Sequence, residues 1–245
     1  SRLVGFFGDY MKQGGFPEYL QTGKDEYLKS LYDNILYRDI IVRHNVRSDR
    51  AMRLVANFAA SNVGKEISFN GLRKMVGLSN PVTVRDYFHF LEDSYLVFLL
   101  PRYSDSLKKQ IYFNKKVYFI DPKLAELVGF RFSEDRGRML ENLVFLHLRR
   151  FHSDLYFHRE KRECDFIVRE RNRTEQAIQV CWQLDGTNRK RELAGLSEAM
   201  DMYELSEGLI LTYRQETTLD LEGRQVTIMP VWKWLLEYQG LVQDI

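Results

Sequence analysis

Two short stretches decide the fold of this chain of 245 residues: RECDFIV at residues 162–168 and AIQVCWQ at residues 177–183. Both are rich in β-branched, aromatic and small apolar residues, and charged residues separate them, which is typical of neighbouring strands. A third run of this kind lies at residues 155–158. The sequence therefore predicts three consecutive strands, and the rest of the fold is built outward from them.

Helices and further strands flank this group. Helices are expected at residues 138–150, 189–203 and 231–238, and further strands at 208–213 and 225–229. Strands that are followed by a crossover helix and another strand indicate a mixed sheet covered by helices. Residues 131–245 are therefore predicted to form one mixed α/β domain.

Residues 49–130 have a different order of elements. Three helices are expected at 51–61, 69–76 and 81–95, with Ser79 or Asn80 as the N-cap of the third helix and Pro81 in its first turn. Strands are expected at 97–103 and 116–121. Three helices followed by a two-stranded wing are typical of a winged helix-turn-helix.

This winged helix-turn-helix would offer contacts to DNA. The candidate side chains lie early in the third helix, before its turn and at the expected wing tip: Thr83, Arg85, Arg73, Lys74, Lys108 and Lys109. Cations at these places suit phosphate groups. Acidic residues on the same helix oppose a polyanion, so an interaction or spacer module stays open as the alternative.

Residues 1–48 are predicted to be helical. Apolar residues recur at helical spacing before residue 14, and Gly-Gly-Phe-Pro at residues 14–17 ends that helix. A second apolar stripe extends from Leu28 to Ile41. We expect a helical connector, for which an ordinary helical packing unit is a sufficient explanation.

Composition limits the class of protein. Hydrophobic residues make up 44% of the chain and the formal net charge is +2, which excludes a disordered chain and a global polycation. The apolar runs are too short to cross a bilayer, and the two cysteines cannot form a disulfide framework. We therefore expect a cytoplasmic protein with no membrane association, in which nucleic-acid contacts come from local patches.

Four residues of the α/β domain are expected to meet in one cleft. Glu141 lies beside an apolar stripe of its helix, where an unpaired charge is costly. Asp165 begins a strand, and Gln179 and Cys181 share a face of the next strand. The cations that open the crossover helix are either a solvated face or a phosphate-contact patch beside this cleft: Arg189, Lys190 and Arg191.

The sequence resembles the restriction-endonuclease-like fold at GRMLENLVFLHL (137–148), RECDFIV and AIQVCWQ. It resembles more closely the C-terminal region attached to bacterial and archaeal AAA-type ATPases. Further stretches that carry this resemblance are GGFPEYL (14–20), LYRDII (36–41), GLSNPVTVRDYFHFLEDSYLVFLL (77–100), FIDPKLA (119–125) and IMPVWKWL (228–235). The resemblance covers nearly the whole chain.

The resemblance implies that an ATPase core precedes Ser1 and that residues 1–48 are its lid or connector. The chain has no G-x-x-x-x-G-K-[ST] loop, so ATP and Mg²⁺ would be bound by the preceding part and no cofactor by this chain. In active nucleases of this fold, an acid on the helix, an aspartate and a Glu-x-Lys pair bind a divalent cation.

Glu141 and Asp165 match that nuclease pattern, but Gln179 and Cys181 replace its second acid and its lysine. A neutral amide holds a divalent cation weakly, and cysteine supplies no ammonium for the developing phosphate charge. We therefore expect a degenerate PD-(D/E)XK site without a complete catalytic set, in which the two acids are buried and paired with arginine. Substitute cations on the preceding turn, at Arg159, Lys161 or Arg162, stay open.

Three functions follow from these expectations. The first is a non-catalytic C-terminal region of an AAA-type ATPase that binds double-stranded DNA or a partner protein. The second is a working Mg²⁺-dependent nuclease, for which Glu141 and Asp165 would be the metal ligands. The third is a protein-interaction module of a toxin–antitoxin or defence system.

Overall fold

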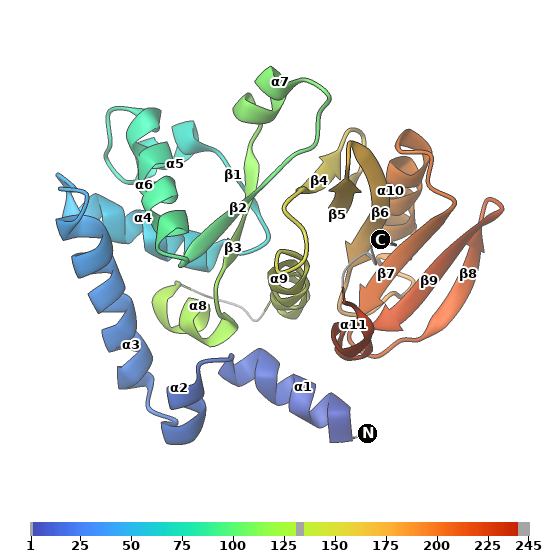
Figure 1. Cartoon of the computed structure of the whole chain (residues 1–245), viewed down its shortest axis with the longest axis horizontal. Coiled ribbons are helices and arrows are strands. Elements are labelled where there is room, and N and C mark those ends of the chain that lie inside the picture. Colours follow the sequence, from blue (N-terminus) through green and yellow to red (C-terminus); the bar gives the residue numbers. More distant parts are fainter. Residues whose placement is uncertain (1, 131–134, 240–245) are drawn as a thin grey trace. The chain divides into compact units, whose positions relative to one another are not determined.

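The computed structural model describes residues 2–130 and 135–239 (Figure 1). The chain divides into two compact units. The helical unit comprises Phe6–Leu99 and Asn114–Glu134, and the sheet unit comprises Ser1–Gly5, Leu100–Phe113 and Asp135–Ile245. Residues 6–48, which the sequence analysis sets apart as a connector, thus belong to the same unit as residues 49–99. The expected boundary after residue 130 falls at residues 131–134, outside the described part.

The helical unit combines helices with a small sheet. Its elements are α1 (Arg2–Gln13), which begins in the sheet unit, α2 (Pro17–Thr22), α3 (Asp25–Asn34), η1 (Ile35–Val42), α4 (Asp49–Ser61), β1 (Glu66–Ile67), α5 (Phe69–Met75), α6 (Pro81–Asp93), β2 (Val97–Pro101), β3 (Lys115–Phe119) and α8 (Pro122–Val128). The three strands form one sheet in the order β1-β3-β2. Its core includes Met52 of α4 and Phe88 of α6, both fully buried.

Side-chain caps fix where these helices begin. The hydroxyl of Ser48 accepts the N–H of Ala51 at the start of α4, and Asn80 Oδ1 accepts the N–H of Val82 at 2.9 Å at the start of α6. Pro81 is the first residue of α6, where its missing N–H costs nothing. Of the two N-caps that the sequence allows, Asn80 is therefore the one used.

The segment η1 is a π-helix that continues α3. The buried residues Leu28, Tyr32, Leu36 and Ile40 recur at every fourth position. In an α-helix this spacing drifts around the axis, because one turn takes 3.6 residues. The wider π-helical turn reduces that drift and keeps the apolar stripe on one side.

The predicted wing is wrong at its tip. The strand β2 ends at Pro101 instead of Tyr103, and the connection to β3 contains a helix, α7 (Leu107–Tyr112). Lys108 and Lys109 are exposed on this helix, which belongs to the sheet unit. The physical reason is that the backbone N–H of Tyr103 bonds to Phe157 O at 2.9 Å, and Ser106 then caps a new helix.

Two stretches that are distant in the sequence meet at the N-terminus of α8. The carboxylate of Asp121 accepts the N–H of Leu124 at 2.9 Å and the N–H of Gly15 at 2.7 Å. Gly14 has φ +71°, and a Cβ placed there would lie 2.3 Å from Asp121 Oδ2. The Gly-Gly-Phe-Pro stretch is thus fastened to the Ile-Asp-Pro stretch, and the glycine is needed for both its φ and its close approach.

We expect Gly14→Ala to lower the free energy of unfolding of the helical unit by about 1–3 kcal/mol, because it adds strain and displaces the cap carboxylate. Gly23→Ala is the matched control, since Gly23 has φ +64° but nothing within 4 Å of its Cβ position. Both variants share the strain of positive φ. The difference between their free energies of unfolding, measured by chemical denaturation followed by circular dichroism, therefore reports the contact of residue 14 with Asp121. Equal losses in the two variants would contradict the role of Asp121.

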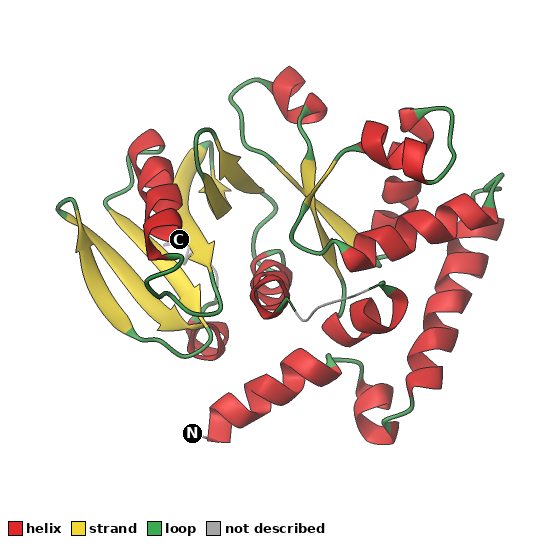
Figure 2. Cartoon of the chain, turned by 180° about the vertical axis from the view of Figure 1, so that it is seen from behind, coloured by secondary structure: helices red, strands yellow, loops and turns green. Residues whose placement is uncertain are grey.

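The sheet unit is built on a six-stranded mixed sheet (Figure 2). Its elements after α7 are α9 (Arg136–Leu148), β4 (Leu155–Arg159), β5 (Glu163–Glu170), β6 (Arg173–Val180), α10 (Arg189–Met202), β7 (Glu207–Thr212), β8 (Thr217–Leu221), β9 (Arg224–Pro230) and α11 (Val231–Glu237). The strand order is β4-β5-β6-β7-β9-β8, in which β6–β7 and β7–β9 are parallel and the other pairs antiparallel. The predicted mixed α/β class is confirmed.

Helices cover this sheet as predicted. The crossover helix α10 packs on β5, β6 and β7, α9 packs on β6, and α11 packs on β7, β9 and α9. The approach of α10 is close: a Cβ at Gly195 would lie 1.9 Å from Glu163 O. Only a residue without a side chain fits there, so the sequence of α10 fixes how deeply it sits against β5.

Two histidines, one on α9 and one shortly after it, contact Tyr238, which follows α11. His147 Nε2 lies 3.1 Å from Tyr238 O, and His152 Nε2 lies 2.7 Å from Tyr238 Oη. His147 also packs edge-on against Trp234. Burial lowers the pKa of both histidines, although Glu170 beside His152 opposes the shift there. The neutral imidazoles are therefore the forms that the fold favours.

These pKa shifts predict acid sensitivity of the sheet unit. A histidine in the unfolded chain has a pKa of about 6.5. As the pH falls through that value, the unfolded chain binds protons that the folded protein does not bind. The free energy of unfolding therefore decreases. We expect the wild type to lose stability from pH 7 to pH 5 and the variant His147→Gln/His152→Gln to lose less. Tryptophan emission reports this unit, because all three tryptophans lie in it. The control His89→Gln alters an exposed histidine of the helical unit, and an unchanged acid response in the double variant would contradict the assignment.

Candidate functional site

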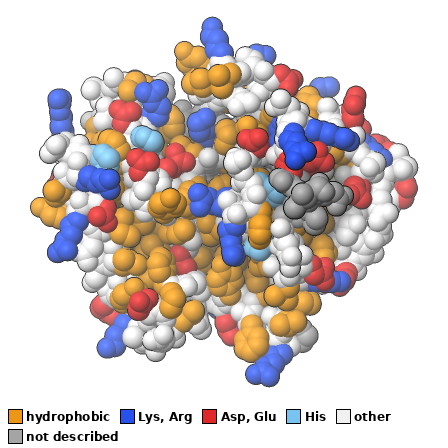
Figure 3. Space-filling view, in the orientation of Figure 1, with side chains coloured by type: hydrophobic (Ala, Val, Ile, Leu, Met, Phe, Trp, Pro, Cys, Tyr) orange, Lys and Arg blue, Asp and Glu red, His pale blue; other side chains and the backbone are white. Residues whose placement is uncertain are grey.

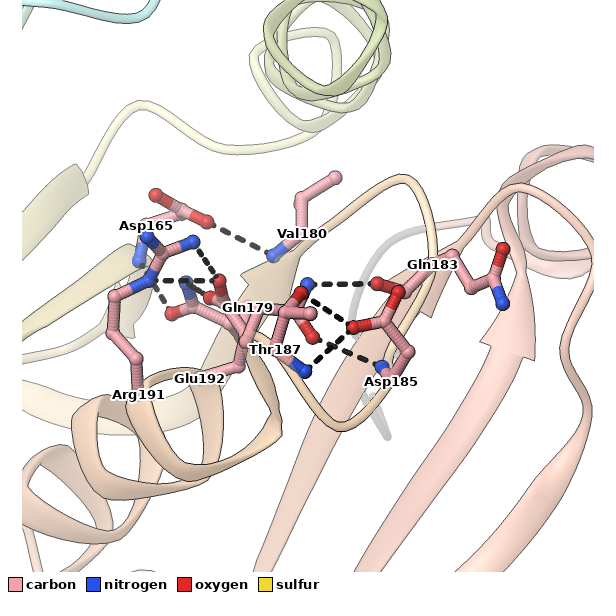
Figure 4. Close-up of polar contacts among 9 residues, drawn as sticks. Asp165, Gln179, Val180, Gln183, Asp185, Thr187, Arg191 and Glu192 are labelled. Atoms are coloured by element: carbon pink, nitrogen blue, oxygen red, sulfur yellow. Dashed lines mark hydrogen bonds and ion pairs between the residues drawn. The ribbon is translucent and has the colours of Figure 1, made fainter.

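The expected site residues Asp165 and Gln179 lie side by side on neighbouring strands, β5 and β6 (Figure 4). Each side chain bonds to the other strand: the N–H of Val180 donates to Asp165 Oδ2 at 2.9 Å, and the N–H of Asp165 donates to Gln179 Oε1 at 3.3 Å. Both side chains are buried. Buried polar side chains need hydrogen-bond partners within the protein, because an unsatisfied buried polar group costs about 1–3 kcal/mol.

A third polar residue, Glu192, completes this group. It lies in the first turn of α10 and is 4% exposed. Gln179 Nε2 donates to Glu192 Oε2 at 2.6 Å, and the guanidinium of Arg191 donates to Glu192 Oε1 at 2.5 and 3.1 Å. We call Asp165, Gln179, Arg191 and Glu192 the carboxylate network.

Glu192 is not among the site residues predicted from the sequence. Its signal is the spacing on the crossover helix, where Glu192, Leu196 and Ala199 recur at helical intervals and are all buried. An acid on the apolar face of a helix indicates a buried partner, because an unpaired charge there is costly. That partner, Gln179, lies on a strand 13 residues earlier in the chain.

Cys181 follows β6 and is buried beside the network. Burial raises the pKa of its thiol to about 12, and the carboxylates of Glu192 and Asp165 contribute to the same shift. The thiol therefore stays protonated at neutral pH and is a poor nucleophile. It supplies no positive charge at the position where the resemblance expects lysine.

Glu141 is buried on α9, the helix that packs against β6. Of the four residues expected in one cleft, Asp165 and Gln179 are joined by a hydrogen bond. Cys181 lies close enough for the carboxylate of Asp165 to raise the pKa of its thiol. Among residues 2–130 and 135–239, no three His, Cys, Asp or Glu side chains lie close enough to hold a metal ion. In the network, both oxygens of Glu192 and Oδ2 of Asp165 accept hydrogen bonds from protein groups.

The cations at the start of α10 differ in their surroundings. Arg189, Lys190 and Arg191 are all exposed, and Arg191 is bound to Glu192 of the network. The side chains of Arg189 and Lys190 form no ion pair with the described residues. In Figure 3, Lys and Arg side chains are interspersed with Asp and Glu side chains.

The remaining candidates for DNA contact lie in the helical unit. Arg73 Nε bonds to Asn70 Oδ1 at 2.7 Å, so this side chain also supports the turn between α5 and α6. Lys74 is exposed, and Thr83 is partly buried in the first turn of α6. Arg85 is exposed and lies 3.8 Å from Asp86, an arrangement that leaves its guanidinium accessible.

We expect Gln179→Glu to destabilise the sheet unit by about 1–3 kcal/mol at pH 7, because it places a second carboxylate against Glu192. Gln179→Met is the control that removes the same hydrogen bonds without adding charge. Neighbouring carboxylates raise each other's pKa, so the deficit of Gln179→Glu shrinks from pH 7 to pH 5, whereas that of Gln179→Met does not. Thermal unfolding across this range measures both, and a Gln179→Glu variant as stable as the wild type would contradict the contact.

The chain matches two protein families, each over a separate segment. Residues 6–133 match a family described as Domain of unknown function (DUF8612), and residues 136–234 match Domain of unknown function (DUF4143). The first match covers more than half of the chain. These boundaries agree with the start of the sheet unit's main segment at Asp135.

Similar proteins occur in archaea and bacteria. An uncharacterized protein of Methanocaldococcus jannaschii is 32% identical over 97% of this chain and 57% of its own length. An uncharacterized protein of Haemophilus influenzae is 27% identical over 97% of this chain and 60% of its own length. The chain thus spans about three fifths of the length of these curated relatives. No solved structure matches it significantly.

Proposed function

The chain belongs to the DUF8612 family, and on that premise we propose that it is the non-catalytic C-terminal region of a larger AAA-type ATPase and binds DNA. The sequence resemblance to the C-terminal region of AAA-type ATPases supports this proposal. The greater length of the two relatives supports it as well, because they have room for a further domain. In this proposal the ATP and Mg²⁺ sites belong to that further domain.

The order of elements supports a winged helix-turn-helix at residues 49–130. The elements α4, β1, α5, α6, β2 and β3 follow one another, and their strands pair in the order β1-β3-β2. In this arrangement α6 is the recognition helix, and its first turns carry Thr83 and Arg85. The connection through α7 makes the wing unlike a simple hairpin.

The carboxylate network is the observation that carries the non-catalytic part of the proposal. A divalent cation is held by several oxygen ligands, chiefly from carboxylates, and binds more tightly when more of them are charged. Here Gln179 and Arg191 occupy both oxygens of Glu192, and the N–H of Val180 bonds to Asp165. Cys181 stays neutral beside them. The network therefore ties β5, β6 and α10 together, and its chemistry suits a structural use of a nuclease-like fold.

No described helix is long and apolar enough to cross a bilayer.

A protein partner is the second candidate, favoured by α7. Leu107, Ile111 and Tyr112 are 72%, 60% and 78% exposed on this short helix. Exposed apolar side chains that gather on one element are typical of protein contacts. This observation supports a protein-interaction module as the alternative function.

DNA binding predicts a steep dependence on salt. For duplex DNA, the logarithm of the association constant falls with the logarithm of salt concentration by about 0.9 for each phosphate contact. We expect Arg85→Gln and Lys190→Gln each to reduce this slope by about 1. Lys29→Gln is the control, because Lys29 is exposed on α3 and forms no ion pair with the described residues. A wild-type affinity that does not change with salt would exclude phosphate-dominated binding and favour the protein partner.

The nuclease alternative has its own test. We expect plasmid DNA to stay intact when it is incubated with the wild type and Mg²⁺ or Mn²⁺, because the network oxygens are engaged. Asp165→Ala serves as the control for contaminating nuclease. Cleavage by the wild type that Asp165→Ala abolishes would replace the non-catalytic proposal with an active nuclease.

A further inference from the structure

A hollow of about 450 Å³ lies in the helical unit, between the end of η1 and the end of α6. Six residues line it: Asp39, Arg43, His44, Phe90, Asp93 and Ser94. Pockets for small molecules have volumes of about 300–1,000 Å³. One side of the hollow is η1, a π-helix, and this rare form is frequent at functional sites. The proposed DNA contacts of α6 lie in its first turns, so the hollow at its C-terminal end is a separate candidate site.

The core of the helical unit holds the two sides of this hollow in place. The N–H of His44 donates to Ile40 O at 3.0 Å, and the hydroxyl of Ser94 donates to Leu91 O at 3.0 Å. Ile40 and Leu91 are fully buried. The rings of His44 and Phe90 stack with centroids 3.9 Å apart and planes 12° apart, and so join the two sides. The backbone of the hollow is therefore fixed before a ligand binds, which lowers the entropic cost of binding.

The charged side chains that line the hollow are exposed. Asp39 and Arg43 are four residues apart, a spacing at which such side chains pair along an α-helix. Within the described part of the chain, however, neither forms an ion pair or a side-chain hydrogen bond. Asp93 Oδ2 lies 3.7 Å from His89 Nε2. This imidazole is a weak partner at neutral pH, because a histidine is charged only when it is protonated. All three charges are therefore available to a ligand.

These charges define the class of ligand. Two carboxylates and one guanidinium line the hollow. Asp93 is the last residue of α6, where the helix end adds partial negative charge. Among the described residues, no three His, Cys, Asp or Glu side chains form a group that could hold a metal ion. The complementary ligand is therefore an organic molecule that carries two positive groups and one negative group.

We propose that this hollow binds a free basic α-amino acid such as L-arginine. The α-carboxylate of the ligand pairs with Arg43, and its α-ammonium and side-chain cation pair with Asp39 and Asp93. Hydrogen bonds between charged groups of this kind are about twice as strong as those between neutral groups. The apolar stem of the ligand packs on the wall that His44 and Phe90 form. This inference goes beyond the proposed function, because DNA binding does not require a small-molecule ligand.

A hollow that only attracts cations by its net charge would rank ligands differently. Agmatine is arginine without the carboxylate, so it has a higher positive charge than arginine but nothing to pair with Arg43. L-Citrulline has the shape of arginine and lacks its side-chain charge. Attraction by net charge alone favours agmatine over L-arginine. The proposed pairing favours L-arginine over both analogues.

Isothermal titration calorimetry of the full chain with these three ligands tests the inference. We expect agmatine and L-citrulline to bind at least about tenfold more weakly than L-arginine, because each lacks one charged contact. A fourth ligand, Nα-acetyl-L-arginine amide, represents an arginine side chain within a protein. If it binds as tightly as L-arginine, the free amino acid is overturned as the ligand and a side chain of a partner protein takes its place.

Variants assign each charge of the hollow. We expect Arg43→Gln to weaken L-arginine binding about tenfold without weakening agmatine binding, because agmatine has no carboxylate. Asp39→Asn and Asp93→Asn weaken the binding of both ligands. The controls Arg47→Gln and Asp9→Asn remove exposed charges that lie outside the hollow and form no ion pair with the described residues. All five positions are exposed, so we expect the variants to fold, which thermal unfolding checks.

Two further results would overturn the inference. The first is a wild type that does not bind L-arginine, or binds it with an affinity that the three variants of the hollow leave unchanged. The second is tighter binding of agmatine than of L-arginine. Neither result bears on the proposed function, because the salt dependence of DNA binding is measured without an amino acid and through other residues.

Discussion

The parallel pairing of β6 with β7 is the constraint on which the sheet unit depends. Two parallel strands cannot be joined by a tight turn, so the chain has to cross over the sheet, and α10 is that crossover. Gly195 lets this helix press against β5. The close approach brings Glu192 down to Gln179, and the same pairing sets Trp182 beside Tyr213. One topological requirement thus positions both the carboxylate network and the Trp182–Tyr213 pair.

The residues of the network complement one another in charge and in hydrogen bonding. An acid at position 179 would face Glu192 at hydrogen-bond distance, and two buried carboxylates repel each other unless one is protonated or a cation lies between them. Glutamine removes the repulsion and donates to Glu192 instead. Arg191 is an exposed partner, and its guanidinium balances the buried charge of Glu192 from the surface. Both oxygens of Glu192 therefore have hydrogen-bond partners from the protein itself.

The sequence predicts the local features well and the contacts between distant elements poorly. The alternation of apolar residues and the turn residues predict nearly all strands and helices of the sheet unit, because these signals are local. The strand β8 is missed because Thr-Thr-Leu-Asp-Leu is a mostly exposed edge strand with little apolar content. The cap at Ser106 that starts α7 is weak next to the apolar run before it. Glu192 and the Trp182–Tyr213 stack depend on which strands become neighbours, and the strand order cannot be derived from periodicity.

Binding and cleavage place opposite demands on the end of β6. Cleavage needs carboxylates that are open to a cation, whereas binding needs a rigid platform with cations around it. Here Gln179 donates to the carboxylate of Glu192, Cys181 is a buried protonated thiol, and the partly exposed Trp182 follows directly. The hydrogen bonds that close the network also fix the backbone of Val180, two residues before the ring. These hydrogen bonds therefore hold the end of β6 by contacts within the sheet unit itself.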